Sequence, residues 1–154
     1  MSNVRPHTRT SVAHNQIALA AEQLDAAIEL FLPERSDVSA LTLAGAAEEI
    51  LGWAVKLAGG ENAMQEAYAA SALTHRYLHH QELKWQDFAD GENYARNAAK
   101  HLKKEDDRAI EVNLRHAAMW MIVRACANYD RLGLDTTDRM REFNNWFSEH
   151  EVGM

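Results

Sequence analysis

The stretch Ile17–Pro33, with the sequence IALAAEQLDAAIELFLP, decides the fold class of this chain. Its apolar residues recur at intervals of three and four, which is typical of a helix with one face in a core. Because proline cannot continue a helix, Pro33 ends this one. The pattern predicts a first helix from about residue 14 to residue 32. Its expected core face is Ile17, Ala20, Ala21, Leu24, Ala27, Ile28 and Phe31.

The rest of the chain continues in helical segments, because alanine is abundant and strand-like alternation is scarce. Capping residues and glycines divide it. They are Ser36 or Asp37, Gly59 and Gly60, Asn62, Asp90 or Gly91, Gly133, and Thr136 or Thr137. Residues 80–90 are expected to form a connection anchored by Leu83, Trp85 and Phe88. We therefore predict an all-α fold, an antiparallel helical bundle of five to six helices. The later helices are expected at about residues 38–58, 62–80, 90–103, 112–132 and 136–150.

The length and composition of the chain indicate a single domain. It has 154 residues, of which 47% are hydrophobic, and a chain of this size can bury about 70% of its unfolded surface. Residues 1–13 lack a periodic apolar pattern and are expected to be a flexible N-terminal arm, leaving 14–154 as one helical bundle domain. No apolar run approaches the roughly 18 residues of a membrane span, and no secretory signal is evident. We expect no membrane partner and a cytoplasmic location.

Charge and cysteine content limit the kinds of partner and site. The formal net charge of −7 opposes indiscriminate attraction to nucleic acid, so any RNA contact must be local. The single cysteine, Cys126, lies in an apolar helical run and is expected to be a small core residue. One cysteine also excludes a disulfide or a thiolate cluster within one chain.

The hexapeptide Arg96-Asn97-Ala98-Ala99-Lys100-His101 is the best candidate for a functional site. At about 100° per residue, Asn97 and His101 lie roughly 40° apart on one helical face, and Tyr94 shares that face. Arg96 is turned from His101 by about 140°, so it would have to reach around the helix. Together with Lys100, the following Lys103 and Lys104 make a basic patch that could hold a phosphate.

These residue types suit attack of an RNA 2′-hydroxyl on the adjacent phosphodiester, which needs proton transfer and charge stabilisation but no metal. His101 can move a proton near neutral pH because the reference pKa of histidine is about 6.5. Arg96 offers a planar fork of donors to phosphate oxygens, and Asn97 could orient the imidazole or the phosphate. The nucleophile is the 2′-hydroxyl itself, so the substrate would be RNA rather than DNA.

A purely structural explanation exists for the same segment. Basic residues late in a helix complement the helix dipole, and Glu92 at the start of the segment fits the same rule. On this interpretation residues 96–104 are a solvated helix end with no ligand.

The hexapeptide, together with the helices before it, resembles the HEPN superfamily of small helical bundles. The family signature is an Arg, then a polar residue, then a His a few positions later, which Arg96, Asn97 and His101 match. The segments AAEQLDAAIELF (20–31) and SALTLAGAAEEILGWAVK (39–56) resemble the family's first antiparallel hairpin. The resemblance covers roughly residues 14–132, and the last helix extends beyond the minimal bundle.

The resemblance implies a metal-independent endoribonuclease of the toxin or RNA-processing kind, without a cofactor. It implies a homodimer whose two motifs face a shared cleft, with Arg96 and His101 catalytic and Asn97 assisting. An antitoxin or a nucleotidyltransferase-like protein is a possible partner. Glu48 matches a position where family members often carry an acidic residue; because it lies on an apolar face, it requires a charged or hydrogen-bonding partner.

Two alternatives remain open at this point. The first is a non-catalytic HEPN-like bundle that binds RNA, a nucleotide or a protein partner; burial of Arg96 with internal partners would favour it over catalysis. The second uses His75 and His79, whose spacing of four on a helix can bind a metal. Those histidines can equally be ordinary polar positions, and the chain has no Glu-x-x-His motif of a di-iron bundle.

Overall fold

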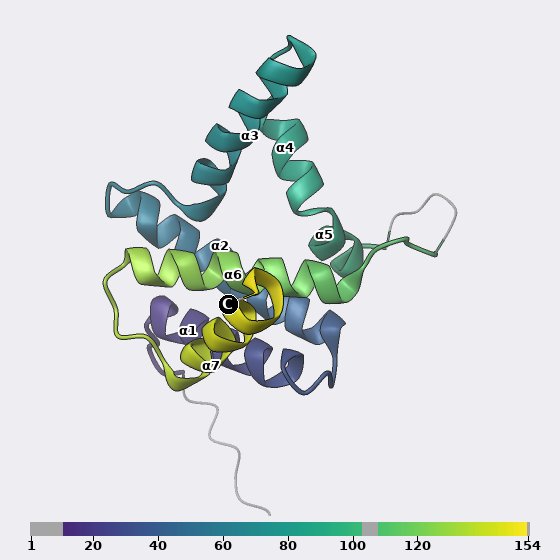
Figure 1. Cartoon of the computed structure of the whole chain (residues 1–154). Helices are drawn as coiled ribbons and strands as arrows, with labels where there is room; N and C mark the ends of the chain where they lie inside the picture. The colour runs from purple at the N-terminus through teal and green to yellow at the C-terminus, as the bar shows by residue number, and fades with distance from the viewer. Residues whose placement is uncertain (1–10, 103–107, 154) are drawn as a thin grey trace, which may run out of the picture.

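The fold is all-helical in the part of the chain that the computed structural model describes, residues 11–102 and 108–153. Those residues form seven α-helices and one short π-helical turn, without a β-strand. This confirms the predicted all-α class, with more helices than the five to six expected. Three of them build the core of the bundle (Figure 1): α1 (Gln16–Phe31), α2 (Asp37–Leu57) and α6 (Leu114–Arg131).

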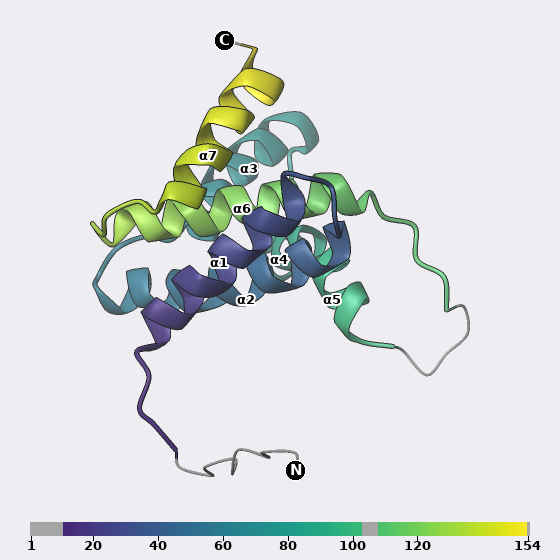
Figure 2. The same cartoon turned by 90° about the horizontal axis from the view of Figure 1, so that it is seen from below.

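The core forms along the apolar faces that the sequence pattern predicted. Leu24, Ile28 and Phe31 of α1 are fully buried. The small residues Ala44 and Gly45 of α2 are buried as well, so neighbouring helices can approach closely. The most extensive contacts in the fold join α2 to α6 and α1, and Figure 2 shows these three helices packed together. Helix α6, close to the helix predicted at residues 112–132, is thus central to the bundle.

Side-chain caps fix where the helices begin. The Asn15 side chain accepts hydrogen bonds from two backbone N–H groups at the start of α1, and Ser36 caps α2. Asn62 forms a reciprocal capping box with Gln65 at the start of α3 (Ala63–His79). Such caps satisfy N–H groups that have no partner inside the helix. The observed starts of α1, α2 and α3 therefore lie within about two residues of those predicted.

The last helix, α7 (Asp138–Phe147), packs against the end of α1. Thr137, one of the two threonines predicted as its cap, caps it, and Met140 and Phe143 are buried. The Phe31 ring meets the Phe143 ring edge-on, with centroids 5.8 Å apart. The helix continues into the π-helical turn Ser148–Val152.

Helix α2 is long and apolar enough to cross a membrane, by length and composition only. Half of its 18-residue apolar window is buried inside the bundle. The core helix of a soluble protein has the same properties, so α2 gives only weak support for a membrane span.

The helices α3 and α4 (Trp85–Glu92) project away from the bundle as a hairpin (Figure 1). In α3 only Ala63 and Met64, at the base, are buried. Farther out, the Tyr68 ring packs edge-on against Trp85, at 5.2 Å between centroids, and its hydroxyl donates to the Leu83 carbonyl at 2.8 Å. Aromatic packing between the two helices therefore holds this hairpin together. We call α3, α4 and α5 together the arm.

The predicted connection at residues 80–90 and the predicted helix at 90–103 are wrong in detail. Helix α4 already starts at Trp85, because Trp85 and Phe88, three residues apart, both pack on Tyr68 of α3. At Asn93 the backbone turns, and a separate helix α5 (Tyr94–Lys100) follows. His101 lies beyond α5 in an extended conformation.

Candidate functional site

Helix α5, which carries the hexapeptide, is held on α2 by the stem of Arg96. Seven residues are too few for a helix to be stable on its own. At Gly45 of α2, an added Cβ would lie only 2.5 Å from Cδ of Arg96. The absence of a side chain at Gly45 therefore allows Arg96 to lie directly on α2.

The guanidinium of Arg96 forms two ion pairs with consecutive carboxylates of α2. Its Nη1 lies 3.8 Å from Oε2 of Glu48 and 3.8 Å from Oε2 of Glu49. The side chains of Arg96 and Glu48 are only 12% and 8% exposed. Glu48 thus has the positively charged partner that its position on the apolar face requires.

Arg124 of α6 is the second positive charge on Glu48, and it also holds the junction of α4 and α5. Its Nε lies 3.8 Å from Oε1 of Glu48, and its Nη1 lies 3.4 Å from Oε2 of Glu92. Its Nη2 donates to Oδ1 of Asn93 at 2.9 Å. Arg124 was not predicted as a site residue, although an arginine in so apolar a helix requires a partner just as Glu48 does.

Burial raises the pKa of Glu48 above its ordinary value, because a carboxylate is poorly solvated there. Arg124, then Arg96, lower the pKa by favouring the charged form, and Glu49 raises it. Three carboxylates, Glu48, Glu49 and Glu92, surround the two guanidiniums. The positive charge of Arg96 is therefore already matched by the two carboxylates of α2, which leaves little excess charge for a phosphate.

The other residues of the hexapeptide face solvent. Tyr94, Asn97, Lys100 and His101 are all exposed, whereas Arg96 is turned toward α2. Nε of Arg96 donates to Oδ1 of Asn97 at 3.4 Å. Among the described residues, no side-chain hydrogen bond or ion pair joins Arg96 to His101. Lys103 and Lys104, predicted to extend the basic patch, lie outside the described residues.

The predicted helical face shared by Asn97 and His101 does not form. The backbone of His101 has φ −125° and ψ 114°, which is extended, so the regular rotation per residue stops at Lys100. The amide of His101 still donates to the Asn97 carbonyl at 3.0 Å. The imidazole thus extends from the end of α5 rather than from its side.

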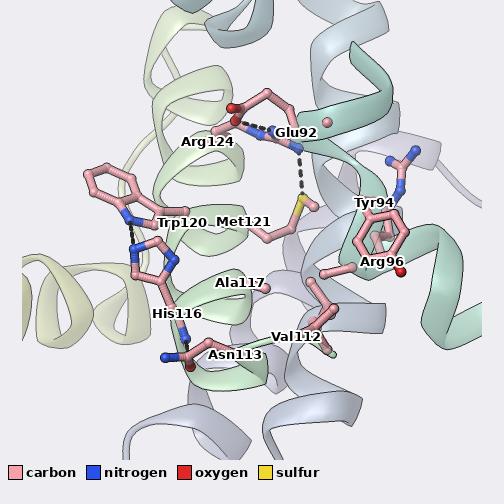
Figure 3. Close-up of a pocket in the computed structure, with 13 residues that line it drawn as sticks. Glu92, Tyr94, Arg96, Val112, Asn113, His116, Ala117, Trp120, Met121 and Arg124 are labelled. Carbon is pink, nitrogen blue, oxygen red and sulfur yellow. Dashed lines mark hydrogen bonds and ion pairs between the residues drawn. The ribbon is translucent and has the colours of Figure 1, made fainter. Parts of the chain in front are cut away.

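A cleft of about 430 Å³ lies between α5 and the first half of α6 (Figure 3). Tyr94 lines it on the α5 side, and His116 and Trp120 line it on the α6 side. The indole Nε1 of Trp120 donates to Nε2 of His116 at 3.0 Å. Ala117 and Met121 form an apolar part of the wall. Its size and its mixture of aromatic and polar groups suit a planar ligand such as a nucleobase.

The sequence did not single out His116 or Trp120 as site residues. A usable signal was present, because His116 and Trp120 are four residues apart and therefore share a helical face. What the spacing could not provide was the position of Tyr94 across the cleft.

The two remaining candidates from the sequence are now placed. The rings of His75 and His79 lie 4.8 Å apart, and Nδ1 of His75 is 3.0 Å from the Gln81 carbonyl oxygen. Within residues 11–102 and 108–153, no group of three or more His, Cys, Asp or Glu side chains could hold a metal ion. Cys126 is buried, as predicted, and burial raises the pKa of its thiol to about 12.

Comparison of the chain with protein-family models, with curated proteins and with solved structures gives no match.

Proposed function

We propose that this chain is a HEPN-like protein that acts on RNA as a metal-independent endoribonuclease, in the form of a homodimer. The observation that carries the proposal is the exposure of Asn97, Lys100 and His101 on α5 and at its end. The buried contact of Arg96 with Glu48 and Gly45 fixes α5 on the bundle, but by itself it favours the non-catalytic alternative. The resemblance of the Arg96-Asn97…His101 pattern to the family motif adds the expected chemistry.

In this proposal the residues of the hexapeptide have different roles. His101 removes the proton of the 2′-hydroxyl, whose oxygen attacks phosphorus and displaces the 5′-oxygen. A proton is then returned to that leaving oxygen, which leaves a cyclic phosphate and a 5′-hydroxyl. Lys100 and Asn97 bind the phosphate oxygens. Arg96 is a positioning residue, because its guanidinium is occupied by Glu48 and Glu49.

The nearby cleft supplies a place for a base next to the reacting phosphate. Single-stranded RNA is commonly bound through unstacked bases on aromatic side chains. Tyr94 and Trp120 offer such surfaces, and both are partly exposed to solvent. The second subunit would bring a second motif, which can supply the proton for the leaving group.

The proposal is tested by incubating the purified chain with single-stranded RNA in the presence of a metal chelator. We expect cleavage that yields cyclic phosphate ends, and its loss in His101→Ala. The matched control is His14→Ala, an exposed histidine just before α1 that should leave cleavage unchanged. Cleavage that persists in His101→Ala would show that the site is assigned wrongly.

The role of Arg96 is tested by comparing Arg96→Lys with Arg96→Ala. A positioning residue can be replaced in part by lysine, because a single ion pair with Glu48 can still hold α5. We expect kcat to be partly restored in Arg96→Lys, with the pH profile unchanged. A residue that binds phosphate through its planar fork would not be rescued by lysine, whose ammonium is a point charge.

A second candidate function is a non-catalytic HEPN-like bundle that binds RNA or a nucleotide. The internal ion pairs of Arg96 favour it, since they leave this guanidinium occupied without a ligand. In that case the chain binds RNA without cutting it. Trp120→Ala should then weaken RNA binding, measured by fluorescence anisotropy, while His101→Ala leaves it nearly unchanged. An antitoxin or nucleotidyltransferase-like partner stays a prediction for either function.

A further inference from the structure

The outward face of α3 is apolar and has no partner within the described residues of the chain. Leu73 and Tyr77 are 69% and 82% exposed, and Ala69 and Ala70 beside them are exposed too. At about 100° per residue these four lie within roughly 60° of Leu73. Tyr68, which packs on α4, lies on the other side of the helix. We call Glu66, Ala69, Ala70, Leu73, Arg76 and Tyr77 the α3 stripe.

A helix in this position needs a partner to be stable. Helix α3 has 17 residues, of which only Ala63 and Met64 at its base are buried. Most helical stability in proteins comes from tertiary packing of an apolar face rather than from the helix alone. Contact with α4 covers one side only. An exposed apolar face such as the α3 stripe is typical of an interaction site.

The arrangement of charges indicates what covers the stripe. Glu66 and Arg76 lie five residues before and five residues after Ser71 on the same face of α3. In a second copy of α3 running antiparallel about Ser71, Glu66 of each chain meets Arg76 of the other. Ala69 and Leu73, two residues on either side of Ser71, likewise place a small residue opposite a large one. A two-fold interface has this property, since residue i contacts j and j contacts i.

We propose that the chain forms a homodimer through antiparallel pairing of two α3 stripes. The carboxylate of Glu66 also pairs with Arg131 of its own chain, yet the side chain is 69% exposed. Arg76 pairs with Glu82 and is 66% exposed. Both charges are therefore accessible to a second chain. This pairing is distinct from the dimer of the proposed function, because the stripe lies on the side of α3 away from Tyr68 and α4 and does not bring two α5 helices together (Figure 1). It is therefore tested by assembly and not by cleavage.

The apolar centre is tested by sedimentation velocity of the full chain over a range of concentrations. The wild-type chain is expected to be a dimer, and Leu73→Asp a monomer, with affinity lowered at least tenfold. The matched control is Leu78→Asp, which changes an exposed leucine of the same helix about 140° away from Leu73. A monomeric wild-type chain would overturn the proposal, as would a dimer that persists in Leu73→Asp. Equal dissociation of the Leu73→Asp and Leu78→Asp dimers would also overturn the proposal.

The charge pairing is tested by mixing two variants, which also protects against a folding defect in Leu73→Asp. Glu66→Lys and Arg76→Glu each place like charges opposite each other, so each should self-associate about tenfold more weakly. Mixed together, they restore opposite charges at both contacts and should form a heterodimer near wild-type affinity. The absence of preferred heterodimers in the mixture would overturn the antiparallel register. RNA cleavage by a chain that stays monomeric would separate the two proposals, because it leaves the activity standing without this interface.

Discussion

The bundle core and the arm are stabilised in different ways. In α1, α2 and α6 whole apolar faces are buried, and each helix covers the faces of its neighbours. In α3, α4 and α5, by contrast, Ala63 and Met64 are the only buried residues. The arm is attached through a few individual contacts: Asn128 at its base, the arginines near α5, and Ala95 and Ala99 of α5, which are only partly buried against the core. The candidate site of this chain therefore lies on the arm, its least buried part.

The largest expected effect belongs to the core. Leu24→Ala removes a fully buried side chain from α1 and should lower the free energy of unfolding by about 2–5 kcal/mol. The matched change in the arm is Phe88→Ala, whose ring is only half-buried against Tyr68. Phe88→Ala should lower the free energy of unfolding by clearly less than Leu24→Ala. Urea unfolding followed by circular dichroism checks both, and equal losses would remove the distinction between core and arm.

The next largest loss of stability is expected where the arm joins the bundle core. Asn128 of α6 is fully buried, and its Oδ1 accepts from the Ala63 amide at 2.8 Å at the first turn of α3. Asn128→Leu removes the acceptor and leaves that amide without a partner, at a cost of about 1–3 kcal/mol. Hydrogen exchange should show lost protection at the start of α3 before any change in α1. Loss of protection spread uniformly over the whole chain would contradict this local role of Asn128.

A smaller effect with a characteristic sign is expected at Gly45. In a helix, Gly→Ala normally stabilises by about 1 kcal/mol. Here the new Cβ would meet the stem of Arg96 at 2.5 Å, so Gly45→Ala should destabilise by about 1 kcal/mol instead. In the Arg96→Ala background the same change should become stabilising. Thermal unfolding of the four proteins of this double-mutant cycle measures the coupling, and additive effects would mean that Arg96 does not lie on Gly45 in solution.

The smallest expected effect is the pH dependence that Glu48 contributes. Its pKa in the folded chain is raised above the ordinary 4.5, chiefly by burial. The folded state therefore holds the proton more tightly, and this stabilisation is complete below pH 4.5 and lost as the pH rises through the folded pKa. In Glu48→Gln the side-chain amide does not titrate, so this contribution is absent. Relative to this variant, wild-type stability should fall as the pH rises above about 4.5, which urea titrations at several pH values can measure.

A constant difference between wild type and Glu48→Gln over that pH range would contradict the raised pKa. A wild-type chain that gains stability relative to the variant would do so too, because it would mean that Arg124 and Arg96 outweigh burial. The first result would mean that burial and the two arginines balance at Glu48, and the second that the ion pairs dominate.

The core could be predicted from the sequence because its signals are local. The spacing of Leu24, Ile28 and Phe31, the stop at Pro33 and the cap at Ser36 all lie within short windows. Helix α4 could not be placed in the same way. Trp85 starts a helix because Tyr68, from a different helix, packs on it, and no nearby residue indicates that contact.

The candidate site was predictable only in part, for a related reason. The rotation per residue separated Arg96 from Asn97, and in the structure Arg96 turns inward while Asn97 is exposed. Arg96 meets Gly45 and Glu48 because of the way α5 packs on α2. Helical spacing alone gives no information about that packing. The prediction placed His101 on the helix because no nearby residue indicates that α5 ends at Lys100.

The burial of Cys126 has a practical consequence for spectroscopy. It is the single cysteine of the chain, and a thiol with a pKa of about 12 is almost fully protonated at neutral pH and reacts slowly with maleimides. A cysteine introduced on the exposed arm would therefore be labelled selectively, without first removing the native one. Spin labels or fluorophores placed there could report the distance between two chains, or between arm and bundle, in the otherwise unaltered protein.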